Sequence, residues 1–374
     1  MADPGTPGGQ WPRAGPRGDI NEQGQQAAMI VQIKSATDFD PGALHRFLDD
    51  RFGACDALEV EKISGGQSNP TYFVTHGNRR MVLRKKPAGP ILPGAHAIER
   101  EYRVLSALHP TGVPVARPIL LHEAADPLGT PFYLMERVEG RVFEDCALPA
   151  LPVADRRAIW MGLADAMAQM HAVRPETVGL GDFGKPGNYF ERQIGRWTRQ
   201  WQQSDSPPIP AIDRLVDWLP RNLPPDDGTV RLAHGDFRIG NMLFHPTEPR
   251  VVAILDWELS TLGHPLADLG FCVMPWHTAP GEYGGILGLD RSAEGLPEEE
   301  DFVARYMQGL PDSAALLPFH KVFALFRFAV IFVGIADRAR AGNAAGDNAA
   351  DVGPLAERFA ERALEIVEGR THAL

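Results

Sequence analysis

The fold of this chain is decided by His234-Gly235-Asp236-Phe237-Arg238-Ile239-Gly240-Asn241, followed by Ile254-Leu255-Asp256-Trp257-Glu258. Asp236 precedes Asn241 by five positions, and Asp256 follows a run rich in β-branched residues, 20 positions after Asp236. An isolated aspartate of this kind is usually a turn former or a helix cap. Two aspartates and an asparagine in this order instead offer the carboxylate and amide oxygens that magnesium prefers.

The same five-residue offset occurs in the catalytic loop of protein kinases. There the aspartate accepts the proton of the acceptor hydroxyl and the asparagine binds magnesium, while a second aspartate after a strand supplies another metal ligand. The pattern therefore predicts ATP- and magnesium-dependent phosphoryl transfer. Asp236 would orient or deprotonate the hydroxyl, Asn241 and Asp256 would hold magnesium, and Arg238 would stabilise the transferring charge.

The two motifs resemble the HGDxxxxN and DxE signatures of the aminoglycoside phosphotransferase and choline kinase superfamily. The resemblance covers roughly residues 38–365 and includes HPLADLG at 264–270, which implies that Asp268 braces the catalytic loop. It implies an α+β, protein-kinase-like bilobal fold. We expect a small antiparallel β-rich N-lobe with one inserted helix, and a larger, mostly helical C-lobe.

A glycine-rich segment between two predicted strands is the candidate phosphate loop. Alone, such a segment is most often a hairpin turn. Beside the downstream motifs it resembles the phosphate loop of choline kinases, where backbone N–H groups can hold phosphate oxygens. The predicted nucleotide contacts in this segment are Ser64, Gly65, Gly66, Ser68 and Asn69.

The next predicted strand carries the phosphate-binding cation. In the family comparison this residue is Arg84, although a one-residue slip in register would give the role to Lys85. The helix predicted at 97–108 places Glu101 on its apolar stripe, with Ile98, Leu105 and Leu108. A carboxylate on an apolar face needs a cation, so we predict an Arg84–Glu101 pair, with an edge-exposed Glu101 as the alternative.

The segment 132–138 has the pattern of the hinge between the lobes, whose backbone would contact adenine. Glu136 and Val138 are the candidate residues there. Any strand joining two lobes would have the same pattern, so these two assignments depend on the family resemblance.

Composition narrows the class of protein. The 374 residues are 44% hydrophobic and 23% charged, with a net charge of −11, which argues against nucleic-acid or anionic-membrane binding. Three cysteines without a CxxC pair favour reduced thiols and a cytoplasmic location. The apolar run 322–336, interrupted by Arg327, is too short to span a bilayer and predicts a buried helix.

The chain divides into three parts in this interpretation. Residues 1–26 are rich in proline and glycine and are expected to be a disordered leader. Residues 27–139 form the nucleotide-binding N-lobe, and residues 140–374 form the C-lobe, which binds the acceptor and carries the catalytic residues.

The acceptor is a hydroxylated small molecule. SGGQSNPTYFV, VLRKKP, YFERQIGRWTRQW and HGDFRIGN resemble the kinase domain joined to acyl-CoA dehydrogenase in family members 10 and 11, and its free-standing bacterial relatives. That resemblance implies a 4-hydroxyacyl-CoA acceptor and a functional link to an acyl-CoA dehydrogenase. Arg192, Arg196 and Arg199 could meet CoA phosphates, although a solvated helix face is the more common explanation for such arginines.

Two other functions stay open. The acceptor could be an aminoglycoside, a choline-like alcohol or a sugar. A nucleotide-binding pseudokinase that acts as an interaction module is disfavoured, because Asp236, Asn241 and Asp256 are all present.

Overall fold

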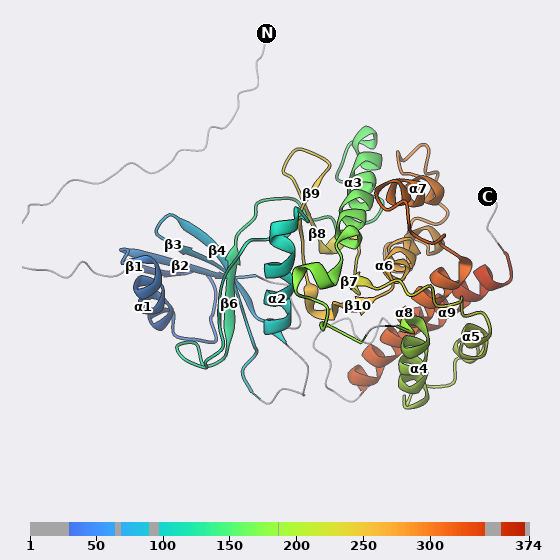
Figure 1. Cartoon of the computed structure of the whole chain (residues 1–374), viewed down its shortest axis with the longest axis horizontal. Coiled ribbons are helices and arrows are strands. Elements are labelled where there is room, and N and C mark those ends of the chain that lie inside the picture. The colour runs from blue at the N-terminus through green and yellow to red at the C-terminus, as the bar shows by residue number, and fades with distance from the viewer. Residues whose placement is uncertain (1–29, 64–68, 90–96, 186, 341–352, 371–374) are drawn as a thin grey trace, which may run out of the picture.

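The computed structural model describes residues 30–63, 69–89, 97–185, 187–340 and 353–370, so the predicted leader lies outside the described residues. A β-sheet lobe with two packed helices stands beside a larger helical lobe, as expected for the kinase-like fold (Figure 1). The N-lobe elements are β1 (Ile30–Ile33), α1 (Pro41–Phe52), β2 (Ala57–Lys62), β3 (Thr71–His76), β4 (Arg79–Lys85), α2 (Ile98–Leu108), β5 (Pro118–His122) and β6 (Phe132–Glu136).

The strands of this lobe form one sheet in the order β1-β2-β3-β4-β6-β5. Neighbours from β2 to β5 are antiparallel, as the sequence predicts. β1 differs because it pairs with β2 in parallel. The reason is that α1 lies between them in the chain, and parallel neighbours need such a crossover.

The helices α1 and α2 lie on opposite sides of the sheet (Figure 1). Asp40 caps α1 by accepting a hydrogen bond from the Gly42 N–H, and Pro41 occupies the first turn. Leu44 and Leu48 of α1 are fully buried in a core shared with β2, β3, β4 and β6. The apolar stripe of α2 instead joins the large core of the C-lobe, so α2 ties the two lobes together.

The C-lobe is mostly helical, with short two-stranded sheets β7–β10 and β8–β9 among its helices. Its elements are α3 (Val153–Ala172), α4 (Tyr189–Gln202), α5 (Pro210–Arg221), β7 (Arg231–Ala233), β8 (Met242–Phe244), β9 (Val251–Ile254), β10 (Thr261–Gly263), α6 (Pro265–Cys272), α7 (Glu299–Gly309), α8 (Pro318–Arg340) and α9 (Gly353–Val367).

The helix α8 contains the predicted buried run. It is the one helix in the described part of the chain that is long and apolar enough to cross a membrane, but 72% of its most apolar window is buried inside the protein. It packs against α4, α5, α6 and α9. The prediction of a core helix is therefore confirmed.

Candidate active site

The catalytic loop follows β7 and is held from below by one buried carboxylate. Asp268 of α6 accepts hydrogen bonds from the backbone N–H groups of His234, at 2.7 Å, and Gly235, at 2.9 Å. His171 of α3 contacts the same carboxylate at 3.2 Å. Gly235 has φ +85°, and a Cβ there would lie 2.8 Å from the Leu259 carbonyl oxygen, so the turn requires glycine. Asp268 therefore braces the loop, as the sequence predicts.

His234 connects the two halves of the motif. Its Nδ1 accepts a hydrogen bond from the Asp236 N–H at 3.2 Å, while Nε2 donates to the Leu255 carbonyl at 2.8 Å. The ring is fully buried and packs against Trp257. This fixes the residue before Asp256 against the turn that carries Asp236, so a histidine that resembles a catalytic base serves as a structural link.

Asp236 and Asn241 are in direct contact. The Asn241 amide nitrogen donates to Asp236 Oδ2 at 2.6 Å and to the Asp236 backbone carbonyl at 2.9 Å. Both bonds use Nδ2, so the amide oxygen is the group left to bind a cation. The Asp236 side chain is 26% exposed, which leaves one face of the carboxylate open to an acceptor.

Asp256 lies close to this pair because of the β8–β9 hairpin. Met242 pairs with Ile254, and the Leu255 N–H donates to the Asn241 carbonyl at 2.8 Å. The two candidate metal ligands, Asn241 and Asp256, therefore lie beside each other at the open end of this hairpin. Asp256 adopts φ +61°, which is uncommon for a residue with a side chain. Its carboxylate is 38% exposed and is turned toward the N-lobe, where it meets Arg84.

Arg84 bridges the lobes. Its Nε lies 2.8 Å from Glu101 Oε2, and its Nη2 lies 3.1 Å from Asp256 Oδ1 and 3.9 Å from Glu258 Oε2. The predicted Arg84–Glu101 pair is present. The contacts with Asp256 and Glu258 reach the C-lobe and were not anticipated from the sequence.

Successive side chains of β4 point to opposite faces of the sheet, and this decides between Arg84 and Lys85. Lys85 points to the other face of the sheet, where its Nζ lies 2.8 Å from Asp38 Oδ2 and is shielded from solvent. Arg84 is thus the residue that faces the catalytic loop.

Glu101 is 2% exposed and is held by three partners besides its helix. Asn69 donates to Oε1 at 2.8 Å, and the Tyr133 hydroxyl donates to Oε2 at 3.1 Å. Burial raises the pKa of Glu101 to about 7, against the lowering effect of Arg84, and the neighbouring Asp256 adds to the rise. Asn69, predicted as a phosphate contact, therefore supports the Arg84–Glu101 pair.

The other predicted nucleotide contacts are either outside the described residues or lie at the end of β6. Ser64, Gly65, Gly66 and Ser68 lie outside the described residues. Glu136 ends β6, its N–H donates to the Arg117 carbonyl at 2.9 Å, and that group is not available to adenine. Val138 follows the end of the strand.

Arg327 of α8 contacts the catalytic loop, which the sequence analysis did not predict. There this residue only interrupts the apolar run 322–336. It is 8% exposed, and its guanidinium donates to the Gly235 carbonyl, next to Asp236. It lies 5.7 Å from the ring of Trp197 and 5.6 Å from that of Phe271. A single cation inside the otherwise apolar run 322–336 was the available signal. Arg327 positions the backbone that carries Asp236.

A cavity of about 390 Å³ opens beside Arg238. Its wall is mainly aromatic and aliphatic, and it includes both Cys146 and Cys272. Arg238 lies at its edge with Nε 3.6 Å from Asp236 Oδ2. The principal apolar side chains of the wall are Trp160, Ile239, Phe271, Met274, Phe328 and Phe359.

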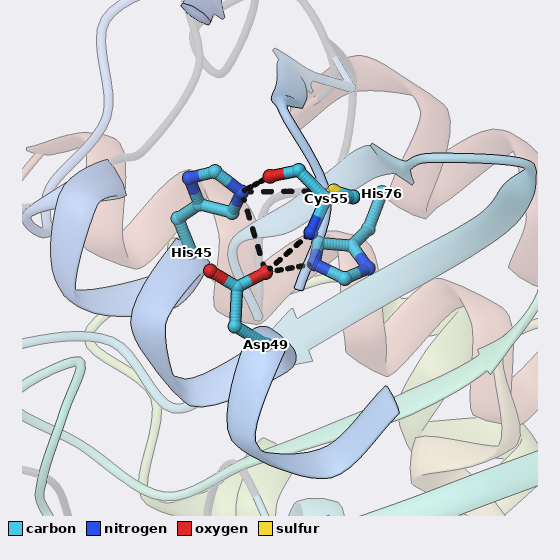
Figure 2. Close-up of side chains that lie close together, drawn as sticks. All are labelled: His45, Asp49, Cys55 and His76. Carbon is cyan, nitrogen blue, oxygen red and sulfur yellow. Dashed lines mark hydrogen bonds and ion pairs between the residues drawn. The ribbon is translucent and has the colours of Figure 1, made fainter. Parts of the chain in front are cut away.

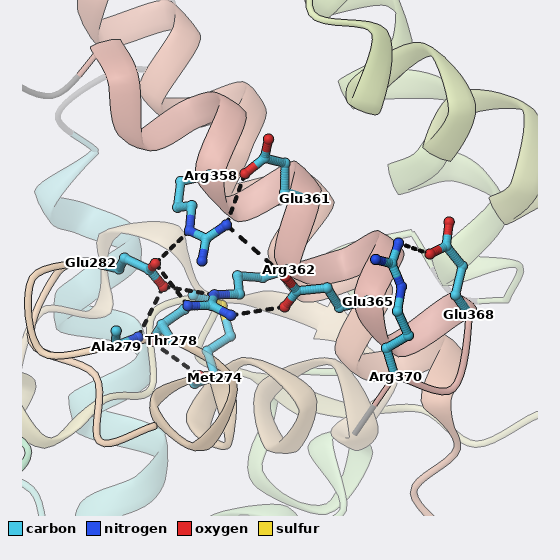
Figure 3. Close-up of polar contacts among 10 residues, drawn as sticks. All are labelled: Met274, Thr278, Ala279, Glu282, Arg358, Glu361, Arg362, Glu365, Glu368 and Arg370. Carbon is cyan, nitrogen blue, oxygen red and sulfur yellow. Dashed lines mark hydrogen bonds and ion pairs between the residues drawn. The ribbon is translucent and has the colours of Figure 1, made fainter. Parts of the chain in front are cut away.

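The segment 279–284 closes one side of this cavity and is anchored to α9 (Figure 3). Glu282 accepts hydrogen bonds from Arg358 and Arg362 of α9 and from the Ala279 N–H. Burial would raise the pKa of Glu282, but these hydrogen bonds lower it to about 2. Next to it, Tyr283 has φ +65° and packs 5.2 Å from Phe328, so an unusual backbone conformation holds an aromatic ring at the cavity edge.

The comparisons with known proteins agree with this geometry. Residues 59–316 match the model of the phosphotransferase enzyme family. The chain belongs to this family. A solved structure named as an aminoglycoside phosphotransferase, from Ralstonia eutropha, is 44% identical, superimposes with a TM-score of 0.80, and covers 88% of this chain and 99% of its own.

More distant solved structures share the fold. An aminoglycoside phosphotransferase in ternary complex with ADP and hygromycin B is 14% identical with a TM-score of 0.57, and covers 87% of this chain and 98% of its own. At that identity the likeness concerns the fold alone.

The curated relatives are longer proteins. Acyl-CoA dehydrogenase family member 11 of Gallus gallus is 38% identical over 90% of this chain, and family member 10 of Mus musculus is 39% identical over 87%. This phosphotransferase spans 44% and 31% of their respective lengths. The chain thus resembles one part of those proteins.

Proposed function

We propose that this chain is an ATP- and magnesium-dependent O-phosphotransferase that moves the γ-phosphate to a hydroxyl on an acyl chain, such as that of a 4-hydroxyacyl-CoA. The observation that carries the proposal is the pair of contacts made by Arg84. This residue joins Glu101 of α2 to Asp256, which lies two residues after the end of β9, across the two lobes. A bridge of this kind brings a phosphate-binding cation next to the metal-binding carboxylate.

The donor set fits magnesium. The Asp256 carboxylate and the Asn241 amide oxygen are hard oxygen donors that flank the open end of the β8–β9 hairpin. Magnesium bound there would neutralise the negative charge of the transferring phosphate. Asp236 orients or deprotonates the acceptor hydroxyl, and Arg238, 3.6 Å away, lies where it can stabilise the transferring charge.

Nucleotide binding would involve the remaining predicted residues. In this proposal Arg84 contacts the phosphates, with Glu101 holding its orientation. The segment 64–69 would cover the phosphates, and the backbone at Glu136 and Val138 would approach adenine. We also propose that the lobe boundary lies near residue 139.

The cavity beside Arg238 supports an acceptor with an apolar part. Its aromatic lining would exclude water from an acyl chain, while Arg238 at its edge and the adjacent Asp236 would receive the hydroxyl. The polycationic aminoglycosides need an acidic site instead. Glu144 and Asp145 at the rim favour that second candidate, whereas Glu282 is already neutralised by two arginines of α9.

The names of the longer relatives suggest a functional link to an acyl-CoA dehydrogenase. We keep this link as part of the proposal, because this chain covers less than half of those proteins. Arg192, Arg196 and Arg199 of α4 are the candidates for CoA phosphates. Arg196 and Arg199 are exposed, and Arg192 also donates to the Lys185 carbonyl.

One screen tests the acceptor class. ADP release would be measured with 4-hydroxyacyl-CoAs of several chain lengths, aminoglycosides, choline-like alcohols and sugars, each with ATP and magnesium. We expect turnover with the hydroxyacyl-CoAs and a dependence of KM on chain length. Turnover with aminoglycosides alone would contradict the acyl acceptor and support an aminoglycoside as the acceptor. Magnesium-dependent ATP binding without turnover on any acceptor would instead support a pseudokinase.

A further inference from the structure

A second polar cluster lies in the N-lobe, away from the catalytic loop. His45 and Asp49 occupy successive turns of α1, Cys55 follows the helix, and His76 ends β3 (Figure 2). We refer to these four residues as the histidine cluster. His76 is at the opposite end of β3 from the predicted phosphate loop, so the histidine cluster is separate from the candidate active site.

The donor atoms of the histidine cluster converge. One ligand atom from each residue lies within 4.8 Å of the other three. His45 Nε2 is 3.5 Å from Asp49 Oδ1 and 3.6 Å from Cys55 Sγ, and His76 Nε2 is 2.8 Å from the same Asp49 oxygen. Zinc bonds of about 2.0–2.3 Å place tetrahedral ligands roughly 3.3–3.8 Å apart. The spacing therefore needs adjustments of only about an ångström to surround one ion.

The two imidazoles are held inside the protein. His45 is 1% exposed and His76 is 3% exposed. Within the described residues His45 Nδ1 has no hydrogen-bond partner, so this ring interacts through Nε2, the atom that faces the other three donors. A buried polar ring with a single interacting atom is well suited to bind a ligand through that atom.

We propose that the histidine cluster binds one zinc ion in a tetrahedral site made of two imidazoles, one carboxylate and one thiolate. Nitrogen and sulfur ligands favour zinc over magnesium, which prefers the oxygens of the catalytic loop. On binding, the Cys55 thiol releases its proton to solvent, and each neutral imidazole carries its proton on Nδ1. All four positions are filled by the protein, so the ion is structural.

The ion would fasten α1 to the sheet. Without it, the cluster is held by hydrogen bonds from the Cys55 N–H and His76 Nε2 to Asp49, from His45 to the Cys55 carbonyl, and from Cys55 Sγ to the Ala57 carbonyl. Zinc replaces the bonds made by the two histidines and by Cys55 Sγ with bonds to a single ion. The expected consequence is a more stable N-lobe.

Cobalt provides the direct test, because a thiolate–cobalt bond gives a charge-transfer band in the near ultraviolet and a tetrahedral site gives strong visible bands. The full chain, stripped with a chelator, is titrated with cobalt in the presence of excess magnesium and ADP, which occupy the active site. We expect one equivalent of cobalt with both bands, displaced by zinc but not by magnesium.

Variants separate this site from the other two cysteines. Cys55→Ser should abolish the charge-transfer band and weaken zinc binding by at least about tenfold, because even outer-shell changes at metal sites cost 10–100-fold. His76→Gln, which keeps a donor for Asp49, should weaken binding while retaining the band. Cys146→Ser is the matched control and should retain both the band and the stoichiometry.

Stability gives a second readout. Zinc should raise the midpoint of thermal unfolding of the unmodified chain and leave that of Cys55→Ser unchanged. A chain that binds no cobalt with a thiolate band, or a band that persists in folded Cys55→Ser, overturns the proposal. The proposed phosphotransferase activity would be unaffected by either result, since the cluster shares no residue with the catalytic loop.

Discussion

The catalytic centre and the cavity beside it are assembled in opposite ways. Asp236, Asn241 and Asp256 come from one short stretch of chain, and their positions are fixed by backbone hydrogen bonds to Asp268 and across the β8–β9 hairpin. The cavity wall instead combines residues of α3, α6, α8 and α9 with the segment 279–284. The three residues proposed to act on the phosphate and the metal are thus brought together by short-range structure, whereas the shape of the proposed acceptor cavity depends on packing between distant helices.

The largest expected effect is that of Asp236→Asn. The asparagine keeps the size of the side chain but cannot accept a proton, so kcat should fall by at least about 10²-fold with every acceptor. ATP affinity should change little. Steady-state kinetics and nucleotide titration measure both quantities, and an unchanged kcat would remove Asp236 from its proposed role.

The second effect concerns Asp256. Asp256→Ala removes a metal ligand and the carboxylate that meets Arg84, so ATP affinity in magnesium should fall roughly 10–100-fold. Calorimetric titration with and without magnesium separates the two contributions. Glu258→Gln is the control, because Glu258 lies 3.9 Å from Arg84 rather than 3.1 Å, and a smaller loss is expected. Equal magnesium dependence in Asp256→Ala and the unmodified chain would contradict the metal assignment.

A change in the cavity should affect acceptors selectively. Tyr283→Ala removes the ring that packs on Phe328 at the cavity edge, so an acyl chain would lose apolar contact there. Loss of contact equivalent to one buried CH₂, about 0.8 kcal/mol, corresponds to a roughly fourfold rise in KM for an acyl acceptor. The tyrosine and the alanine that replaces it would adopt the same left-handed backbone conformation at position 283, so the backbone strain is the same in both proteins. Tyr283→Phe, which keeps the ring, serves as control. If KM rises equally for acyl and sugar acceptors, the cavity does not select the acyl chain.

The last effect concerns stability rather than activity, as a dependence of the free energy of unfolding on pH. The folded-state pKa of Glu282 is about 2, below the ordinary value of 4.5. Its contribution to the free energy of unfolding is therefore complete above pH 4.5 and is lost as the pH falls toward 2.

Glu282→Gln should remove this dependence and cost about 1–2 kcal/mol at neutral pH, less than full linkage because solvent screens the pair. Urea unfolding at pH 3 and pH 7 measures both the loss of stability and its dependence on pH. Glu361→Gln is the control, because Glu361 pairs with Arg358 at the exposed end of the same network (Figure 3). It should lower the free energy of unfolding by less than Glu282→Gln does. An equal loss would show that Glu282 does not specifically anchor the segment 279–284.

The sequence anticipated the parts that depend on short-range pattern. The apolar stripe of α2 predicted that Glu101 faces inward, and the 2% exposure of Glu101 agrees. The spacing of the catalytic motif predicted that Asp236 and Asn241 act together, and they are hydrogen-bonded. By contrast, the contact from Arg327 to the Gly235 carbonyl joins residues 92 positions apart, and no local pattern specifies such a distance.

Sequence pattern alone was therefore sufficient to predict the family, and to propose the groups for phosphoryl transfer, because strand, loop and strand follow one another within a few dozen residues. The tertiary structure decided which face of β4 meets the catalytic loop, how Arg84 reaches Asp256, and how the cavity is shaped. It also brought His45 and His76 together. These depend on close packing between distant segments, which is set by the whole fold rather than by neighbours in the chain.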